Sequence, residues 1–218
     1  MSPDPGSFKD VNEKLPGLQA AVGAGGVGMS DSVYQALLAN RIVFLGSEVR
    51  DDNANAICAQ LLLLNAEDPH KDIYLYINSP GGDFFEGMAI YNLLREHQGK
   101  VTVRVLGVAA SVASVIAMVG NPVIMPENTM MMIHKPWGFA GGDANDMRDY
   151  AELLDKVESV LIPAYAEKTG KSPDEIAAML EDETWMDGKE CVAMGFADQV
   201  TPSLQAMACI QSKRIEDF

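Results

Sequence analysis

Ser111 lies in a stretch of small and apolar residues, 107–120 (GVAASVASVIAMVG). The preceding run, Val101–Leu106, alternates apolar and polar residues and predicts a strand, and Gly107 is expected to turn the chain into a buried helix. A serine in the first turn of that helix would lie near backbone N–H groups without intrahelical partners, which stabilise negative charge. Acyl transfer requires such stabilisation. The alternative is that Ser111 or Ser114 only caps or packs a core helix.

Of the three histidines in the chain, His134 has the position best suited to a catalytic base. It follows an apolar strand expected over Met130–Ile133, so its ring should lie at a sheet edge where loops gather. His70 and His97 lie in polar or charged segments that are typical of the surface. Ser111 and His134 would form a nucleophile and its general base if folding brings them together. The alternative for His134 is a hydrogen-bonded core residue.

Residues 78–82 (NSPGG) follow a predicted strand over Ile73–Ile77. Two adjacent glycines allow backbone conformations that other residues avoid, so N–H groups there can point into a cleft. The N–H groups of Gly82 and Val112 could then form an oxyanion hole beside the nucleophile. A plain tight turn is the alternative for this segment.

A third catalytic residue would be a carboxylate that orients the His134 ring. The candidates are in residues 181–183 (EDE) and at Asp187, although a charged run of this kind is typically a solvated surface. The sequence has no metal-ligand spacing, Walker loop or Rossmann glycine motif. The chemistry is therefore expected to need no metal and no cofactor.

Composition indicates one globular domain with a sizeable core, since 48% of the 218 residues are hydrophobic and 22% are charged. The net charge of −15 argues against a nucleic-acid partner. No apolar run approaches the roughly 18 residues that span a bilayer, and the N-terminus lacks the pattern of a secretory signal. Three cysteines without metal or redox spacing fit a reducing compartment, so a cytoplasmic location is expected.

Alternating strands and helices predict an α/β fold with a mostly parallel sheet covered on both faces. Residues 1–28 are expected to be flexible, 29–200 to form the domain and 201–218 to form a polar tail. Strands are expected over 41–46, 73–77, 101–106, 122–125, 130–133 and 196–200. Helices are expected from 29, over 53–67 and 83–97, after 107, over 143–169, from 172 and over 190–194. In the second of these helices, Leu62 and Leu63 should widen the buried stripe.

Taken together, these segments resemble the Clp family of self-compartmentalising serine peptidases. The matching segments span roughly residues 30–200: 74–82 (YLYINSPGG), 107–111 (GVAAS), 132–136 (MIHKP) and 190–198 (ECVAMGFAD). The resemblance implies a ClpP/crotonase-like fold with a protruding helical handle. It also implies Ser111 as nucleophile, His134 as base, and the Gly82 and Val112 amides as the oxyanion hole. The implied activity is that of an ATP-dependent serine endopeptidase subunit, which hydrolyses unfolded polypeptides inside a ring chamber.

The resemblance implies partners as well. Tyr74 and Tyr76 fall where the family docks a hexameric AAA+ unfoldase, and the helix over 143–169 would be the handle that joins two stacked rings. Residues 1–28 would lie near the axial pore. The third catalytic residue of the family is an aspartate, whereas this sequence places Glu183 there, with Asp182 one residue earlier.

The sequence is compatible with several alternatives. Residues 30–80 resemble a housekeeping Clp subunit, whereas from about Gly82 onward segments such as 137–139 (WGF) and 183–186 (ETWM) resemble Clp-like proteases of tailed phages that act in head maturation. A phage or prophage enzyme, or a composite of both kinds, is therefore one alternative. A catalytically inactive ring subunit is suggested by the unusual third position. A crotonase-like acyl-CoA enzyme is suggested because that fold shares the glycine-amide oxyanion hole.

Overall fold

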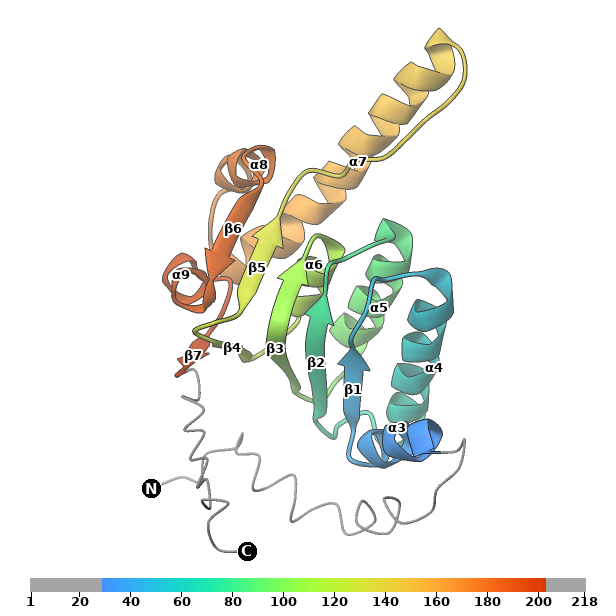
Figure 1. Cartoon of the computed structure of the whole chain (residues 1–218), viewed down its shortest axis with the longest axis vertical. Coiled ribbons are helices and arrows are strands. Elements are labelled where there is room, and N and C mark those ends of the chain that lie inside the picture. Colours follow the sequence, from blue (N-terminus) through green and yellow to red (C-terminus); the bar gives the residue numbers. More distant parts are fainter. Residues whose placement is uncertain (1–28, 203–218) are drawn as a thin grey trace, which may run out of the picture.

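The computed structural model describes residues 29–202, whose strands form one seven-stranded sheet flanked by helices (Figure 1). Five strands lie in parallel in the order β1 (Ile42–Leu45), β2 (Ile73–Ser79), β3 (Val101–Ala110), β4 (Val123–Pro126) and β7 (Gln199–Thr201). Strand β5 (Met130–Ile133) pairs in parallel with the end of β3 and antiparallel with β6 (Thr184–Asp187). The predicted α/β class with a mostly parallel sheet is confirmed.

The helices in the described part of the chain follow the predicted order. They are α3 (Met29–Ala39), α4 (Asp51–Glu67), α5 (Phe84–Glu96), α6 (Val112–Ala117), α7 (Ala144–Thr169), α8 (Pro173–Glu181) and α9 (Gly188–Met194). None of these helices combines the length and apolar character required to cross a bilayer. The predictions for residues 1–28 and for the tail beyond 202 lie outside the described residues.

Local capping signals account for where several helices begin. The Asp83 carboxylate accepts hydrogen bonds from the Phe85 and Glu86 amides at 2.8 and 3.1 Å, which starts α5 as predicted. Ser172 and Glu175 form the predicted capping box of α8, with Pro173 as its first residue. The start of α5 limits the length of the loop at the carboxyl end of β2, and the start of α8 limits the turn after α7.

The two faces of the central sheet differ in burial. In β2, Ile73, Leu75 and Ile77 are completely buried in the main core, whereas Tyr74 and Tyr76 on the other face are half-buried. The expectation of a sheet covered on both faces therefore holds for only one face of the sheet. Parallel sheets normally bury both faces, so the other face leaves apolar surface available for contact.

Helix α4 corrects one detail of the predicted core. Ile57, Leu61 and Leu64 are buried along one stripe, as expected. Leu62 and Leu63 were predicted to widen this stripe, but they are 56% and 49% exposed. The 100° turn between successive helical residues directs these two side chains away from the sheet.

Gly107 does not turn the chain, because β3 continues through it to Ala110 and pairs there with β5. The missing side chain of Gly107 leaves space for Asn78, whose Oδ1 would lie 2.5 Å from a Cβ at position 107. The same oxygen accepts a hydrogen bond from the Val108 amide at 3.2 Å. The glycine therefore admits a polar side chain beside the strand, and the turn comes four residues later.

Two further segments differ from the predictions. His97 was expected at the surface but is 9% exposed, with its ring nitrogens 2.5 Å from Asn65 Oδ1 and 2.9 Å from the Lys71 carbonyl. It therefore joins α4 to the turn before β2, while His70 is exposed as predicted. Strand β6 was not predicted, and the last strand begins at Gln199 rather than Phe196.

Helix α7 projects from the body of the molecule (Figure 1). Its N-terminal half is largely exposed, whereas Val157, Leu161 and Tyr165 in its C-terminal half are buried in the core. One end of the helix is thus anchored by apolar packing and the other extends into solvent. The structure contains the predicted protruding helix.

Candidate active site

Ser111 lies at the turn between β3 and α6, with φ 53° and ψ −133°. Its side chain makes no capping hydrogen bond to α6, so the capping alternative is wrong for this residue. A non-glycine residue at positive φ costs of order 1–3 kcal/mol and persists only where its surroundings hold it. Strained strand-to-helix turns of this kind expose a nucleophilic hydroxyl.

Close backbone packing surrounds the Ser111 turn. The Ser111 amide donates to the Met132 carbonyl of β5 at 2.9 Å. A Cβ at Gly81 would lie 2.5 Å from Ser111 Cβ, and a Cβ at Gly87 would lie 2.2 Å from Val112 Cγ2. Glycine at these two positions therefore allows the segment after β2 and helix α5 to approach the turn.

The imidazole of His134 lies beside the Ser111 hydroxyl, with Nε2 2.9 Å from Oγ. The sheet register explains this contact, because Ala110 at the end of β3 pairs with Met132 near the end of β5. The next residue, Lys135, is fixed by its amide, which donates to the Leu180 carbonyl at 3.1 Å. The structure thus brings together the two residues that the sequence predicted as nucleophile and base.

The surroundings of His134 favour its neutral form. Burial lowers the pKa of the His134 imidazole, and the negative charge of Glu183 opposes this by raising it. Burial is the larger effect, so the pKa of His134 lies below its usual value. A neutral ring can accept the proton of Ser111 at neutral pH.

The candidate carboxylates have different surroundings. Asp187 begins α9 and accepts hydrogen bonds from the Lys189 and Glu190 amides, both at 2.8 Å. Asp182 ends α8 and is exposed. The structure therefore gives Asp187 a capping role and pairs Glu181 with Lys135, and of the four candidates only Glu183 perturbs His134 electrostatically.

Glu183 does not complete a hydrogen-bonded triad. Its Oε1 accepts a hydrogen bond from the Trp185 indole at 3.2 Å. Within residues 29–202, no carboxylate hydrogen-bonds to His134 Nδ1. Glu183 also has φ 49°, so its backbone is held in the left-handed region. In this geometry Glu183 influences the ring through its charge alone.

The amide of Gly82 points away from the neighbouring segment, which contains Val49. In its parallel bridge with Val49, the Val49 amide donates to the Gly81 carbonyl at 2.7 Å and the Asp83 amide donates to the Val49 carbonyl at 2.9 Å. In a parallel bridge of this kind, the residues before and after Gly82 make the hydrogen bonds to Val49. The Gly82 N–H therefore points away from Val49. Gly82 has φ 143°, and a Cβ there would lie 2.2 Å from the Val49 carbonyl oxygen. This position requires glycine.

The Val112 amide is the second predicted oxyanion donor. Val112 is the first residue of α6, where amides lack intrahelical partners. Since α6 has only six residues, any anion stabilisation there comes from individual amides rather than a long helix dipole. Gly82 and Val112 line the same cavity as Ser111.

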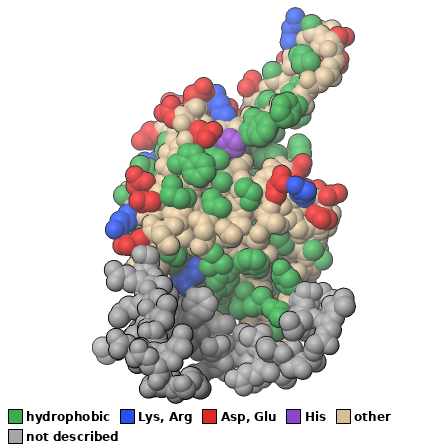
Figure 2. Space-filling model, in the orientation of Figure 1, with side chains coloured by type: hydrophobic (Ala, Val, Ile, Leu, Met, Phe, Trp, Pro, Cys, Tyr) green, Lys and Arg blue, Asp and Glu red, His purple; other side chains and the backbone are tan. Residues whose placement is uncertain are grey.

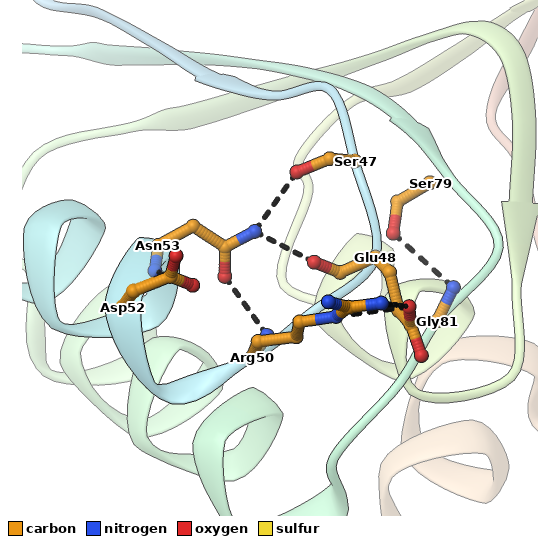
Figure 3. Close-up of polar contacts among 7 residues, drawn as sticks. All are labelled: Ser47, Glu48, Arg50, Asp52, Asn53, Ser79 and Gly81. Carbon is orange, nitrogen blue, oxygen red and sulfur yellow. Dashed lines mark hydrogen bonds and ion pairs between the residues drawn. The ribbon is translucent and has the colours of Figure 1, made fainter.

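Figure 3 shows the polar contacts that support the Gly82 segment. The Asn53 amide group donates to Ser47 Oγ at 2.9 Å and to the Glu48 carbonyl at 2.6 Å, and its oxygen accepts from the Arg50 amide at 2.9 Å. These bonds hold the loop that carries Val49. On the other side, buried Ser79 accepts from the Gly81 amide at 3.2 Å. These supporting hydrogen bonds were not predicted from the sequence, because no local motif marks residues 47–53.

A cavity of about 570 Å³ opens over Ser111 and His134. Its walls come from the Gly82 segment, the start of α5, the loop after His134 and helix α7. The apolar and aromatic lining residues are Pro80, Phe84, Phe85, Val112, Val115, Met132, Pro136, Trp137, Tyr150, Leu153, Leu154, Val157, Leu161 and Tyr165. Figure 2 shows hydrophobic side chains gathered beside a histidine where the projecting helix meets the body. The cavity is suited to an extended chain with apolar side chains.

No cluster of three or more His, Cys, Asp or Glu side chains that could hold a metal ion occurs in residues 29–202. The functional groups present at the site are a hydroxyl, an imidazole and backbone amides. This set is suited to acyl transfer by a serine nucleophile.

Comparison with known proteins places this arrangement in context. Residues 25–203 match the family model described as Clp protease. The ATP-dependent Clp protease proteolytic subunit 2 of Cutibacterium acnes is 43% identical over 189 residues, covering 84% of this chain and 89% of the relative. Proteolytic subunit 1 of Leifsonia xyli is 40% identical over 185 residues, covering 84% and 93%. Proteolytic subunit 1 of Frankia casuarinae is 43% identical over 183 residues, covering 83% and 85%.

Proposed function

The chain belongs to the Clp protease family, and we propose that Ser111 and His134 carry out its serine endopeptidase chemistry. Its relatives are named proteolytic subunits of ATP-dependent Clp protease, and their similarity extends over more than four fifths of this chain. The chain is accordingly a Clp-type serine endopeptidase. The observation that supports the two residue roles is the 2.9 Å contact between Ser111 Oγ and His134 Nε2.

The proposed reaction begins when Ser111 Oγ attacks a substrate carbonyl carbon while His134 Nε2 accepts the hydroxyl proton. The carbon–nitrogen bond then breaks as His134 returns the proton to the leaving amine. Water, deprotonated by the same ring, hydrolyses the acyl-enzyme and regenerates Ser111. The neutral state that burial favours in His134 suits the first of these steps.

The developing oxyanion would be stabilised by the Gly82 and Val112 amides. Support comes from the presence of both residues in the wall of the cavity that holds Ser111, and from the bonding of Val49 to the neighbours of Gly82 instead of to Gly82 itself. Removing one such donor typically lowers kcat by about 10²–10³-fold.

Glu183 is proposed as the third residue, acting through its charge. Replacing it by glutamine removes the charge that raises the pKa of His134, so the acidic limb of the profile of kcat/KM against pH should move to lower pH. The fall in kcat should be about tenfold, well below the ~10⁴-fold loss when a hydrogen-bonded triad carboxylate is replaced. Steady-state kinetics between pH 5 and 9 measure both effects.

Asp182→Asn and Asp187→Asn are the matched controls for Glu183→Gln, since each removes one carboxylate charge from the same part of the chain. Neither residue perturbs the pKa of His134, so the acidic limb should stay where it is in the wild type. A shift in Asp182→Asn without one in Glu183→Gln would assign the third role to Asp182.

The proposed substrate is an unfolded polypeptide that enters the cavity as an extended chain, with an apolar side chain against the aromatic lining. Apolar side chains gain about 25 cal/mol per Å² of surface removed from water, which favours such residues next to the cleaved bond. No metal or cofactor takes part in these steps. ATP would be consumed by a partner that unfolds and delivers the substrate.

Two surfaces support partners of the kind that the relatives' names indicate. Half-buried Tyr74 and Tyr76 lie side by side on the exposed face of β2, and they are proposed to dock a Clp ATPase. The projecting half of α7 is proposed to join this subunit to others in stacked rings. The predicted cytoplasmic location is the compartment in which these partners would act.

The similarity to cellular Clp subunits also bears on the phage-like alternative. Alignments of 183–189 residues in a chain of 218 necessarily extend well beyond Gly82. The resemblance to cellular subunits is therefore not confined to residues 30–80, and a cellular proteolytic subunit is the function best supported.

Hydrolysis of a short fluorogenic peptide by the full-length chain, without ATP, tests this function. Turnover is expected because the proposed chemistry needs no nucleotide. Assembled protein that fails to cleave the peptide, alone and with a Clp ATPase, would indicate an inactive ring subunit. Thioester hydrolysis that survives Ser111→Ala would indicate an acyl-CoA enzyme.

A further inference from the structure

A buried serine and a buried tyrosine lie directly behind the Ser111 turn. Ser114 of α6 and Tyr165 of α7 are 0% and 1% exposed. Ser114 Oγ lies 2.6 Å from the Ser111 carbonyl oxygen and 2.7 Å from the Tyr165 hydroxyl. The proposed reaction uses neither of these hydroxyl groups, yet both are connected to the main chain of the nucleophile.

Each hydroxyl group has only one hydrogen to donate, and this fixes the direction of the two hydrogen bonds of Ser114. A carbonyl oxygen only accepts, so the Ser114 hydroxyl donates its single hydrogen to Ser111. Ser114 Oγ must then accept the hydrogen of the Tyr165 hydroxyl. Burial raises the pKa of Tyr165 well above its usual range, so this hydroxyl keeps its hydrogen at neutral pH. The chain of donors runs from Tyr165 through Ser114 to the Ser111 carbonyl.

The Ser111 carbonyl is linked rigidly to the Val112 N–H. Both groups belong to one planar trans peptide and point in opposite directions. Restraining the carbonyl therefore restrains the direction of the N–H. The Ser114 amide donates to the same carbonyl at 2.9 Å, so this peptide is held by two donors. Because Ser111 has a strained φ of 53°, a peptide without such restraints would be free to rotate toward a commoner conformation.

We propose that Ser114 and Tyr165 are positioning residues that aim the Val112 N–H at the oxyanion. This inference rests on the proposed function, because it deepens the account of the same oxyanion hole. A misaimed donor weakens binding of the transition state more than binding of the substrate. The loss should therefore appear in kcat and not in KM.

The experiment compares Ser114→Ala, Tyr165→Phe and the double variant in the full-length assembled protein, with a fluorogenic peptide as substrate. Ser114→Ala should lower kcat about tenfold and Tyr165→Phe about threefold, with KM within twofold of the wild type. Because Tyr165 acts through Ser114, the double variant should be no slower than Ser114→Ala. Tyr165→Phe removes one oxygen atom and preserves packing, so it tests the inference even if Ser114→Ala assembles poorly.

Thr129→Val is the matched control. Thr129 is 1% exposed, and its hydroxyl donates to the Pro126 carbonyl at 2.8 Å, a similar buried bond outside the site. This variant should lower the unfolding temperature without changing kcat. An unchanged kcat in both Ser114→Ala and Tyr165→Phe, or independent multiplicative losses in the double variant, would overturn the inference. A wild-type protein that neither cleaves peptide nor reacts at Ser111 would overturn the proposed function instead.

Discussion

Replacing Ser111 by alanine is expected to lower kcat for peptide hydrolysis by about 10⁴-fold or more. The substitution removes the proposed nucleophile, and the oxyanion amides then act only on attack by water. The fold should be preserved, because the Ser111 side chain makes no helix-capping bond and its oxygen contacts His134. Peptide hydrolysis measures the loss, while circular dichroism and sedimentation confirm fold and assembly.

Ser159→Ala is the matched control for this prediction. Ser159 is exposed on α7, and its hydroxyl bonds to the Lys156 carbonyl of its own helix. Activity equal to that of the wild type is expected. If Ser111→Ala, freshly purified and assembled, kept more than one tenth of the wild-type rate, Ser111 would not be the nucleophile.

Replacing His134 by alanine should cause a loss of similar size, about 10⁴-fold or more in kcat. Within residues 29–202 the imidazole is the only group that hydrogen-bonds to Ser111 Oγ, so its removal takes away the proposed proton acceptor. Residues that act as one unit are not additive, so the double variant of Ser111 and His134 should be no slower than either single variant. Single-turnover and steady-state assays of the three variants measure this non-additivity.

The dependence of activity on pH gives a second measure of the role of His134. In the wild type, kcat/KM should fall as pH decreases through the pKa of His134, because the protonated ring cannot accept a proton. Burial lowers this pKa, so activity should persist to lower pH than for an ordinary histidine. The residual activity of His134→Ala should lack this acidic limb, and His70→Ala, at an exposed position, should retain it. An unchanged limb in His134→Ala would contradict the assignment.

Local signals in the sequence predicted much of the framework. The capping residues of α5 and α8, the alternation at the start of β3 and the apolar stripe of α4 depend on neighbouring residues, so a single segment carries the information. His134 could be predicted at the end of β5 for the same reason. The family resemblance, carried by segments in the right order, then suggested how these elements pack.

Features that depend on distant partners were missed. Strand β6 has four residues after an acidic run, and its pairing with β5 exists only in the folded sheet. The run 181–183 is exposed, as its charge indicated, but the bond from the Trp185 indole to the Glu183 carboxylate was not foreseen. Gly107 was read as a turn because its close neighbour, Asn78, lies far away in the sequence.

The candidate site shows the same division. Residue types identified the nucleophile, the base and the two amides as hypotheses, but their meeting depends on the register that places Met132 beside Ala110. The conformation of Ser111 and the buried bonds of Ser114 have no sequence signature, because a serine in an apolar stretch is equally compatible with plain packing. Only the packed structure distinguishes these possibilities.

Reaction with a fluorophosphonate, followed by peptide mapping with mass spectrometry, tests the central claim that His134 activates Ser111. The account predicts one phosphonate adduct per subunit in the assembled wild-type protein, located on Ser111. The rate of labelling should fall by at least about 10²-fold in His134→Ala. An adduct on another residue, or equally fast labelling without the imidazole, would contradict it.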